Sequence, residues 1–238
     1  MLEPGSIERV LVIMAHPDDV DFSAAGTVAW LTDAGIPVTY CLVTDGQAGG
    51  FDLTTSRADI VSIRRAEQTE AAKEVGVTEL VFLGWEDGQV AVSIGLRRDL
   101  ARVIRQVRPT IVITQSPSIN LDRIPANHPD HRATGEAAID AIYPDARNPF
   151  AFPELLDEGL EAWTVAEMWL VTAGEANAAV DITEQLERKL RALLAHRSQH
   201  PDPNGVVQRV QAWNQANAVQ FGLPGDHAAE VFRVVDTR

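Results

Sequence analysis

Short apolar runs alternate with longer amphipathic segments over residues 9–115. No turn former interrupts the first run, Val10–Met14, which is typical of a strand buried on both faces of a parallel sheet. Strands joined by helices imply right-handed crossovers, so the pattern predicts an α/β fold, a Rossmann-like three-layer sandwich with a mostly parallel sheet. The predicted strands are Arg9–Ala15, Pro37–Thr44, Glu79–Trp85 and Thr110–Thr114, and the predicted helices are about Phe22–Asp33, Ala58–Val75 and Ser93–Arg108.

The alternation weakens after residue 143. Prolines and phenylalanines in Tyr143–Gly159 indicate a long ordered loop, which we expect near the ligand pocket. The further elements predicted are strands at Ala162–Thr172, Asp181–Ile182 and Ala228–Val235, and helices at Thr183–His196, with Thr183 as N-cap, and Val206–Phe221. Without an internal repeat or a second apolar core, we expect one domain, 1–238, with a core at 9–143 and a C-terminal elaboration at 144–238.

The first stretch that suggests chemistry, Ala15–Asp19, directly follows the first predicted strand and reads Ala-His-Pro-Asp-Asp. Open α/β sheets keep their ligand crevice at the carboxyl ends of their strands. An imidazole and two carboxylates within four residues are costly to place together unless a cation or a reaction uses them. The alternative is that Asp18 or Asp19 only caps the following helix, and this stretch alone does not decide between the two interpretations.

A second such stretch, His128-Pro129-Asp130-His131, follows the fourth predicted strand and opens a predicted helix, Arg132–Ile142. Two histidines three residues apart at a helix start project to one side of the first turn. Since the carboxyl ends of parallel strands share one edge, we expect the two loops to converge. Histidine and aspartate are good ligands for Zn²⁺, and a catalytic zinc site takes three of them plus water. The alternative is that His128 only neighbours a helix N-cap and that Asp130 is a first-turn acid favoured by the helix dipole.

The composition narrows the classes of function. The formal net charge of −14 argues against nucleic acid or an anionic membrane as a partner. No apolar run approaches a membrane span, and the N-terminus lacks a basic region followed by an apolar core, so we expect a cytoplasmic protein. The single cysteine, Cys41, excludes an internal disulfide and lies in an apolar stretch, where we expect it to be buried. No GxGxxG follows the first strand, so the dinucleotide-binding pattern is missing.

At these two stretches the sequence resembles the LmbE-like, or PIG-L-type, N-acetylglucosamine deacetylase superfamily, which includes mycothiol- and bacillithiol-pathway deacetylases. The AHPDD signature is Ala15–Asp19 and the HPDH signature is His128–His131. By this resemblance the metal ligands are His16, Asp19 and His131, and the metal is Zn²⁺, with Fe²⁺ as the alternative. The resemblance covers nearly the whole chain, and both signatures are complete.

The resemblance also implies catalytic roles. Asp18 matches the family's general base, which takes a proton from a metal-activated water as the water attacks the acetamide carbonyl. The imidazolium of His128 would help the metal to stabilise the oxyanion. Asp130 fits a role in orienting an imidazole through its other nitrogen. The sequence does not decide whether Asp18 or His128 protonates the leaving amine.

Two further matches in this resemblance concern the sugar, and a third concerns the active-site loops. Arg64 opens Arg64-Arg65-Ala66-Glu67 and matches an arginine that binds substrate hydroxyls, whereas the alternative is an ordinary solvated or paired side chain. Asp87 matches an acid that accepts hydrogen bonds from sugar hydroxyls, whereas the alternative is a turn-forming Asp-Gly. His196–Gln199 resembles an element that packs beside the active-site loops, and a helix-terminal His196 favoured by the dipole is the alternative.

The resemblance therefore implies a zinc-dependent hydrolase that removes an N-acyl group, acetyl in the first place, from an N-acetylglucosamine-type amino sugar or conjugate. One departure bears on the substrate: the mycothiol-pathway deacetylase has a tyrosine where this chain has Ala126, so we expect Asn127, Trp85 or the 143–159 loop to decide the specificity. The alternatives are a mycothiol S-conjugate amidase-like hydrolase and a catalytically idle sugar-binding protein on the same fold. The sequence leaves the exact substrate and the oligomeric state open, a homo-oligomer included.

Overall fold

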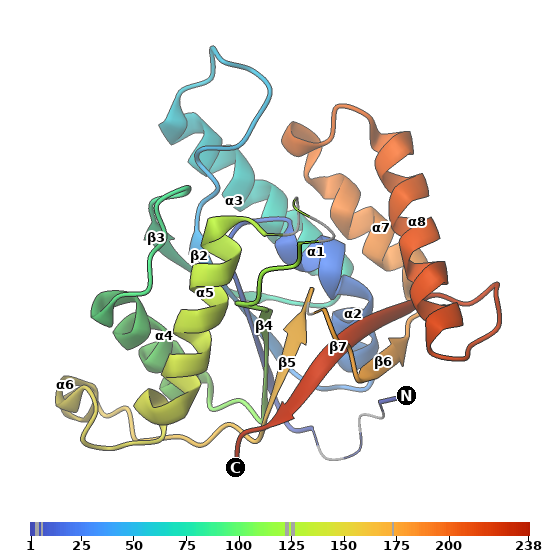
Figure 1. The fold of residues 1–238 in the computed structure, drawn as a ribbon. Coiled ribbons are helices and arrows are strands. Elements are labelled where there is room, and N and C mark those ends of the chain that lie inside the picture. The colour runs from blue at the N-terminus through green and yellow to red at the C-terminus, as the bar shows by residue number, and fades with distance from the viewer. Residues whose placement is uncertain (3–4, 6, 122–123, 125–126, 173) are drawn as a thin grey trace.

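In the part of the chain that the structure describes, seven strands form one central sheet, in the order β3-β2-β1-β4-β5-β7-β6. The structure is a computed structural model that describes residues 1–2, 5, 7–121, 124, 127–172 and 174–238 (Figure 1). Strands β1 to β5 pair in parallel, while β7 runs antiparallel to both β5 and β6. The strands are β1 (Val10–Met14), β2 (Val38–Thr44), β3 (Glu79–Trp85), β4 (Ile111–Gln115), β5 (Glu167–Val171), β6 (Ala178–Asp181) and β7 (Ala229–Asp236). The predicted α/β class with a mostly parallel sheet is confirmed.

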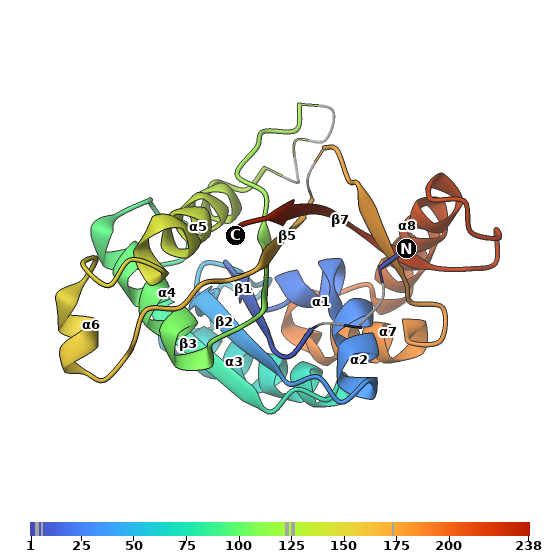
Figure 2. The same cartoon turned by 90° about the horizontal axis from the view of Figure 1, so that it is seen from below.

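Helices cover both faces of this sheet, which gives the three layers visible in Figures 1 and 2. Alternate residues of β1 divide between the layers: Val10 and Val12 pack toward α1, α2, α3 and α7, whereas Leu11 and Ile13 pack toward α4, α5 and α6. The helices are α1 (Asp19–Ser23), α2 (Ala25–Asp33), α3 (Arg57–Glu74), α4 (Ile94–Val107), α5 (Pro129–Asp140), α6 (Pro153–Asp157), α7 (Leu186–Ala195) and α8 (Pro203–Gln220). Among the described residues, none of the helices combines the length and the apolar character needed to cross a bilayer.

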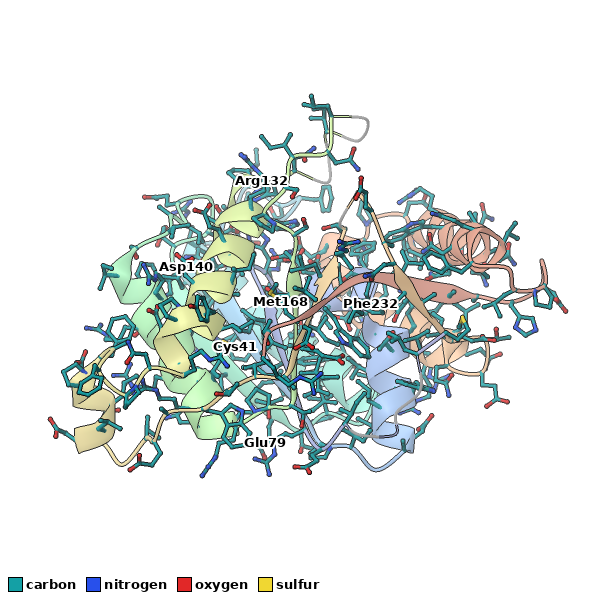
Figure 3. All side chains as sticks on the ribbon, turned by 60° about the horizontal axis from the view of Figure 1, so that its bottom comes forward. Cys41, Glu79, Arg132, Asp140, Met168 and Phe232 are labelled. Carbon is teal, nitrogen blue, oxygen red and sulfur yellow. The ribbon has the colours of Figure 1, made fainter. Side chains whose placement is uncertain are left out.

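The two larger clusters of buried side chains lie against the sheet, and Figure 3 labels members of each. Phe232 belongs to the layer of α1, α2, α3 and α7, whereas Cys41 and Met168 belong to the layer of α4, α5 and α6. Burial raises the pKa of the Cys41 thiol to about 12. The prediction that Cys41 is a buried residue is therefore confirmed.

The expectation that the 143–159 loop lies near the pocket is wrong. The segment forms a short π-helical turn at Ala141–Ala146 and then α6. Arg105, in the last turn of α4, donates hydrogen bonds to the carbonyls of Asp145, Asn148 and Ala151 at 2.9–3.0 Å. Because α4 ends where β4 is about to begin, these bonds hold the segment at the amino ends of the strands, away from the two signature loops.

The helix predicted over Phe22–Asp33 is broken at Ala24, and the break has a physical cause. Glu230 of β7 accepts hydrogen bonds from the backbone N–H groups of Gly26, at 3.0 Å, and Thr27, at 2.6 Å, so it caps α2 from outside. Lys189 of α7 donates to Glu230 at 2.5 Å, and both side chains are almost fully buried. The buried ion pair therefore joins β7 and α7 to the start of α2. The Glu230 carboxylate satisfies free N–H groups at the helix N-terminus, where the helix dipole favours an anion.

The predicted N-cap at Thr183 is also wrong, because α7 begins only at Leu186. The Thr183 hydroxyl instead donates to Asp181 at 2.5 Å and accepts from the Ala228 amide at 3.1 Å. These two contacts hold the end of β6 beside the start of β7, so the threonine serves the strand connection and not the helix.

The Lys189–Glu230 pair gives a prediction about stability. Lys189→Met leaves the Glu230 carboxylate buried without its cation, so the free energy of unfolding should fall by roughly 3–5 kcal/mol in urea titrations. Arg191→Met on the same helix is the control, because the Arg191–Glu74 pair is 54% and 38% exposed and should change stability by less than about 1 kcal/mol. Equal losses in the two variants would contradict a special role for the buried pair.

Candidate metal centre and active site

The two signature loops meet at the carboxyl edge of the sheet because β1 and β4 are neighbouring parallel strands. The loop after β1 carries His16, Asp18 and Asp19, and the start of α5 carries Asp130 and His131. The ring nitrogens His16 Nδ1 and His131 Nε2 are 3.2 Å apart, although 115 residues separate them in sequence. The expected convergence of the loops is therefore present in the structure.

The side chains of His16, Asp19 and His131 form a compact triangle at this meeting point, in which the Asp19 carboxylate presents a different oxygen to each imidazole. Asp19 Oδ2 is 3.3 Å from His16 Nδ1, and Asp19 Oδ1 is 3.0 Å from His131 Nε2. A tetrahedral ion with bonds of about 2.0–2.1 Å places neighbouring ligand atoms roughly 3.3–3.4 Å apart, which the 3.0–3.3 Å sides of this triangle approach. Two imidazoles and one carboxylate are also the donor types that divalent transition metals prefer, so the residues present fit a metal ion.

The outer nitrogen of His16 faces two more carboxylates. His16 Nε2 is 3.1 Å from Asp87 Oδ1 and 3.2 Å from Asp130 Oδ2. Burial alone would lower the pKa of His16, but its hydrogen bonds to Asp130, Asp19 and Asp87 outweigh burial and raise that pKa to about 12. The pocket thus favours positive charge at this point. An N–H on the outer nitrogen leaves the lone pair of Nδ1 aimed at the triangle, the orientation that a metal ligand needs.

Asp19 is held in place by groups at the ends of β1 and β4. Its Oδ2 accepts hydrogen bonds from the His16 amide at 2.8 Å and from Gln115 Nε2 at 3.0 Å. Burial opposes ionisation of Asp19, but the two histidines prevail and hold its pKa well below the ordinary range. Gln115 is a residue that the sequence analysis missed, and its place at the end of β4 is the only signal that could have pointed to it.

His128 lies beside the triangle, and one of its nitrogens is already engaged. His128 is the N-cap of α5, and its Nδ1 accepts a hydrogen bond from the Asp130 amide at 3.2 Å. Burial lowers the pKa of His128, and the neighbouring His16 and His131 lower it further. With Nδ1 accepting a hydrogen bond, the ring N–H belongs on Nε2. Burial and the two nearby histidines both oppose the second proton that the expected imidazolium would carry.

Asp18 points in a different direction from Asp19, whose carboxylate faces His131. The Asp18 carboxylate lies 3.3 Å from Arg64 Nη2, and the backbone of this residue is in the left-handed region, with φ 85°. Its amide donates to Gln68 Oε1 at 2.9 Å. Burial raises the pKa of Asp18 to about 6, with Arg64 acting against the rise. An aspartate poised in this way has the properties of a general base.

A buried hydrogen-bond network stands behind Asp18 and was not foreseen from the sequence. Gln68 donates to Asp21 Oδ2 at 3.0 Å, and His196 Nε2 lies 2.8 Å from the same oxygen. All three side chains are fully buried. His196 therefore lies close to the active-site loops, as expected, and the structure adds its partner: it supports the glutamine that fixes the Asp18 amide.

Arg64 and Asp87, the two predicted sugar-binding residues, line one cavity with His16, Asp18 and His128. Arg64 donates to the carbonyls of Gly46, at 2.8 Å, and Pro17, at 2.6 Å, which ties the loop after β2 to the loop after β1. Asp87 accepts from the Ala48 amide at 2.9 Å as well as facing His16. The structure thus brings all eight predicted site residues together, and it gives Asp87 a contact with His16 that the sequence analysis did not anticipate.

The contacts of Asn127 and Trp85, which were expected to decide the substrate, do not show a role in substrate binding. Ala126, which replaces a tyrosine in the resemblance, lies outside the described residues. Asn127 exchanges hydrogen bonds with the backbone of Asn120, at 2.5 and 2.6 Å, so it shapes its own loop. Trp85 ends β3, and its carbonyl accepts from Gln47 at 3.4 Å.

Comparisons with known proteins agree with this geometry. The family model described as PIG-L, GlcNAc-PI de-N-acetylase, matches residues 11–142, which include both signature loops. A diacetylchitobiose deacetylase from Thermococcus kodakarensis is 31% identical over 97% of this chain and 84% of the relative. A probable N-acetyl-alpha-D-glucosaminyl L-malate deacetylase 2 from Bacillus cereus is 34% identical over 80% of this chain and 83% of the relative. Among solved structures, N,N'-diacetylchitobiose deacetylase from Pyrococcus horikoshii with its inhibitor MPG superposes with a TM-score of 0.90, at 30% identity, covering 98% of this chain and 85% of that one.

The donor triangle predicts one divalent ion per chain. His131→Ala removes one of its three donors, so the purified and desalted variant should lose the stoichiometric metal that elemental analysis finds in the parent. His227→Ala is the control, because His227 pairs with Asp181 at the end of β6, away from the triangle. A His131→Ala protein that still holds one tightly bound ion would contradict this assignment of the metal ligands.

Proposed function

Because this chain belongs to the PIG-L family of de-N-acetylases, we propose that it is a zinc-dependent hydrolase that removes an acetyl group from an N-acetylglucosamine-type sugar or conjugate. The observation that carries the proposal is the donor triangle of His16, Asp19 and His131, whose His16 lines one cavity with Asp18. The relatives named above act on N-acetylated glucosamine derivatives, so the substrate proposed here is a small amino sugar. An idle binding protein is not retained as an alternative, because those relatives are deacetylases.

His16, Asp19 and His131 would hold the metal. A divalent ion supplies Lewis acidity there, which lowers the pKa of a water and polarises an amide carbonyl. Zinc is proposed because it accepts two imidazoles and a carboxylate while leaving a fourth position open. Fe²⁺ is the competing ion, since it accepts the same donor set.

Asp18 is the proposed general base. Its carboxylate lies in the cavity beside the triangle and takes the proton of the water that attacks the amide carbon. Arg64, 3.3 Å away, favours the ionised carboxylate against the effect of burial. The αL backbone and the Gln68 hydrogen bond hold this carboxylate apart from that of Asp19.

His128 is proposed to bind the oxyanion as a neutral donor. With Nδ1 accepting from the Asp130 amide, the Nε2–H group is free to donate one hydrogen bond to the developing charge. A neutral imidazole is a weak acid, so it is poorly suited to protonate the leaving amine. Asp18 carries a proton after the first step, and we assign to it the return of that proton to the amine.

Asp130 acts as a positioning residue in this scheme. Its Oδ2 faces His16 and accepts from the Gly88 amide at 2.6 Å, so it joins the loop after β3 to the loop after β1. Arg64 and Asp87, which line the same cavity, are proposed to bind sugar hydroxyls. The direct test is amine release from a panel of N-acyl amino sugars: activity confined to other amides would refute the proposed substrate class.

Asp18→Asn separates catalysis from metal binding. The amide keeps the shape of the side chain but cannot accept a proton, so kcat should fall by ~10²–10⁴ while the metal content stays near that of the parent. Because the base works only when ionised, kcat/KM of the parent should fall as the pH drops through the pKa of Asp18. Burial raises that pKa to about 6 and a bound cation opposes the rise, so this limb should lie at or below about pH 6 and should vanish in the variant.

Asp19→Asn is the comparison for this experiment, since it should lose metal first and recover part of its activity in excess zinc. The opposite pattern, with metal lost from Asp18→Asn and kept in Asp19→Asn, would exchange the two roles.

Arg64→Lys tests the recognition role. Lysine keeps a positive charge beside Asp18 but loses the planar fork that can bind two acceptors at once. KM should rise by about tenfold, with kcat changed by less than about threefold, as expected when uniform binding is lost. A large fall in kcat with KM unchanged would instead mean that Arg64 acts mainly through Asp18.

A further inference from the structure

A second pocket adjoins the catalytic cavity, and its character is different. Gly49 lines both of them, so the two are adjacent. The second one, called the outer pocket here, lies between the loop after β2, the start of α3 and the segment that follows α7. Its apolar wall is Phe51, Ile60 and Ile63, and Ser198 and Gln199 face that wall.

The outer pocket leaves large apolar side chains in water. Phe51 is 67% exposed and Ile63 is 40% exposed. The catalytic cavity, in contrast, is lined by His16, Asp18, Arg64, Asp87 and His128. A ligand that covers both must be polar at one end and apolar at the other. Burying the apolar end would gain roughly 25 cal/mol for each Å² removed from water.

Hydrogen bonds fix both walls of the outer pocket. Asp52 accepts from the Thr54 amide at 2.9 Å and from the hydroxyls of Thr54 and Thr55 at 2.6 and 2.9 Å. On the other side, Glu67 of α3 accepts from the amide and hydroxyl of Ser198 at 2.8 and 2.7 Å. The pocket is thus shaped before a ligand arrives, which lowers the entropic cost of binding.

The order of groups along the cavity identifies which part of a substrate reaches the outer pocket. The acyl carbon must lie at the donor triangle, beside Asp18. Arg64 comes next, with Nη2 at Asp18 and Nη1 at Gly46. Gly49 packs directly on the far side of this guanidinium, since a Cβ placed there would lie 2.7 Å from Arg64 Nη1. A sugar held by Arg64 therefore lies between the reacting amide and the outer pocket.

We propose that the outer pocket binds an apolar aglycone, an aryl or alkyl group attached to the amino sugar. The inference rests on the proposed function, because it takes the deacetylated sugar as the polar end of the ligand. The acyl chain does not reach the outer pocket in this arrangement, because it begins at the donor triangle and the sugar lies between the two. Phe51, Ile60 and Ile63 then act as specificity-determining residues for the group carried by the sugar.

The test compares two substrates, the phenyl and the methyl glycosides of N-acetylglucosamine. The parent enzyme should have a KM for the phenyl glycoside about tenfold lower, as expected from burying one ring. Phe51→Ala and Ile63→Ala should each remove most of this preference and leave the kinetics of the methyl glycoside unchanged. Leu53→Ala is the matched control, because Leu53 lies on the same loop but is fully exposed, at 101%, and should keep the preference.

Three results would overturn the inference. The first is a parent enzyme that treats the two glycosides alike, and the second is a preference that survives in both pocket variants. The third concerns the methyl glycoside that carries an N-octanoyl group in place of N-acetyl. If the parent enzyme had a higher kcat/KM for it and Phe51→Ala lost that increase, the acyl chain would occupy the pocket. Failure of the proposed function is distinguishable, because no amine would then be released from any of these substrates by the metal-loaded parent.

Discussion

The site depends on the imidazole of His16, which is held from both sides. Asp87 and Asp130 face its outer nitrogen at 3.1 and 3.2 Å, while Asp19 and His131 face its inner nitrogen at 3.3 and 3.2 Å. These partners come from the loops that follow β1, β3 and β4, so one ring fixes three segments of the chain against one another. The arrangement gathers three carboxylates around a buried ring, which is unfavourable without positive charge. A cation in the donor triangle would remove this conflict.

A second constraint separates two adjacent carboxylates. Asp18 adopts φ 85°, which an L-residue rarely does, and its amide is fixed by Gln68. That strain turns its carboxylate to Arg64 while Asp19 turns to the histidines. Gln68 is held in turn by Asp21, and Asp21 by His196, all without contact with water. Strained backbone of this kind persists only where the surrounding structure over-determines it, and here the buried network does so.

Much of the fold and of the site could be predicted because the signals are local. Apolar runs gave β1 to β4 to within one residue at each end, and the shared edge of parallel strands brought the His16 and His131 loops together. The missed features join residues far apart in sequence: Gln115 reaches Asp19 across 96 residues, and His196 reaches Asp21 across 175. The spacing of apolar residues along the sequence does not predict contacts between such distant residues. The 143–159 loop was misplaced because prolines and aromatics mark an ordered irregular segment without stating which end of the sheet it occupies, and Arg105 decides that.

The order of the strands explains why this edge carries the site and what the antiparallel strand adds. The chain winds from β1 out to β3 and then returns to place β4 on the other side of β1, so the crevice opens between the ends of β1 and β4. Strand β7 runs the other way, which puts its first residues, and not its last, at this same edge. Glu230 therefore lies near α1, the helix that begins with Asp19, and caps α2 just beyond it. The first residues of the antiparallel strand β7 thus support the helices that follow the metal-ligand loop. If β7 were parallel to the other strands, its last residues would lie at this edge instead.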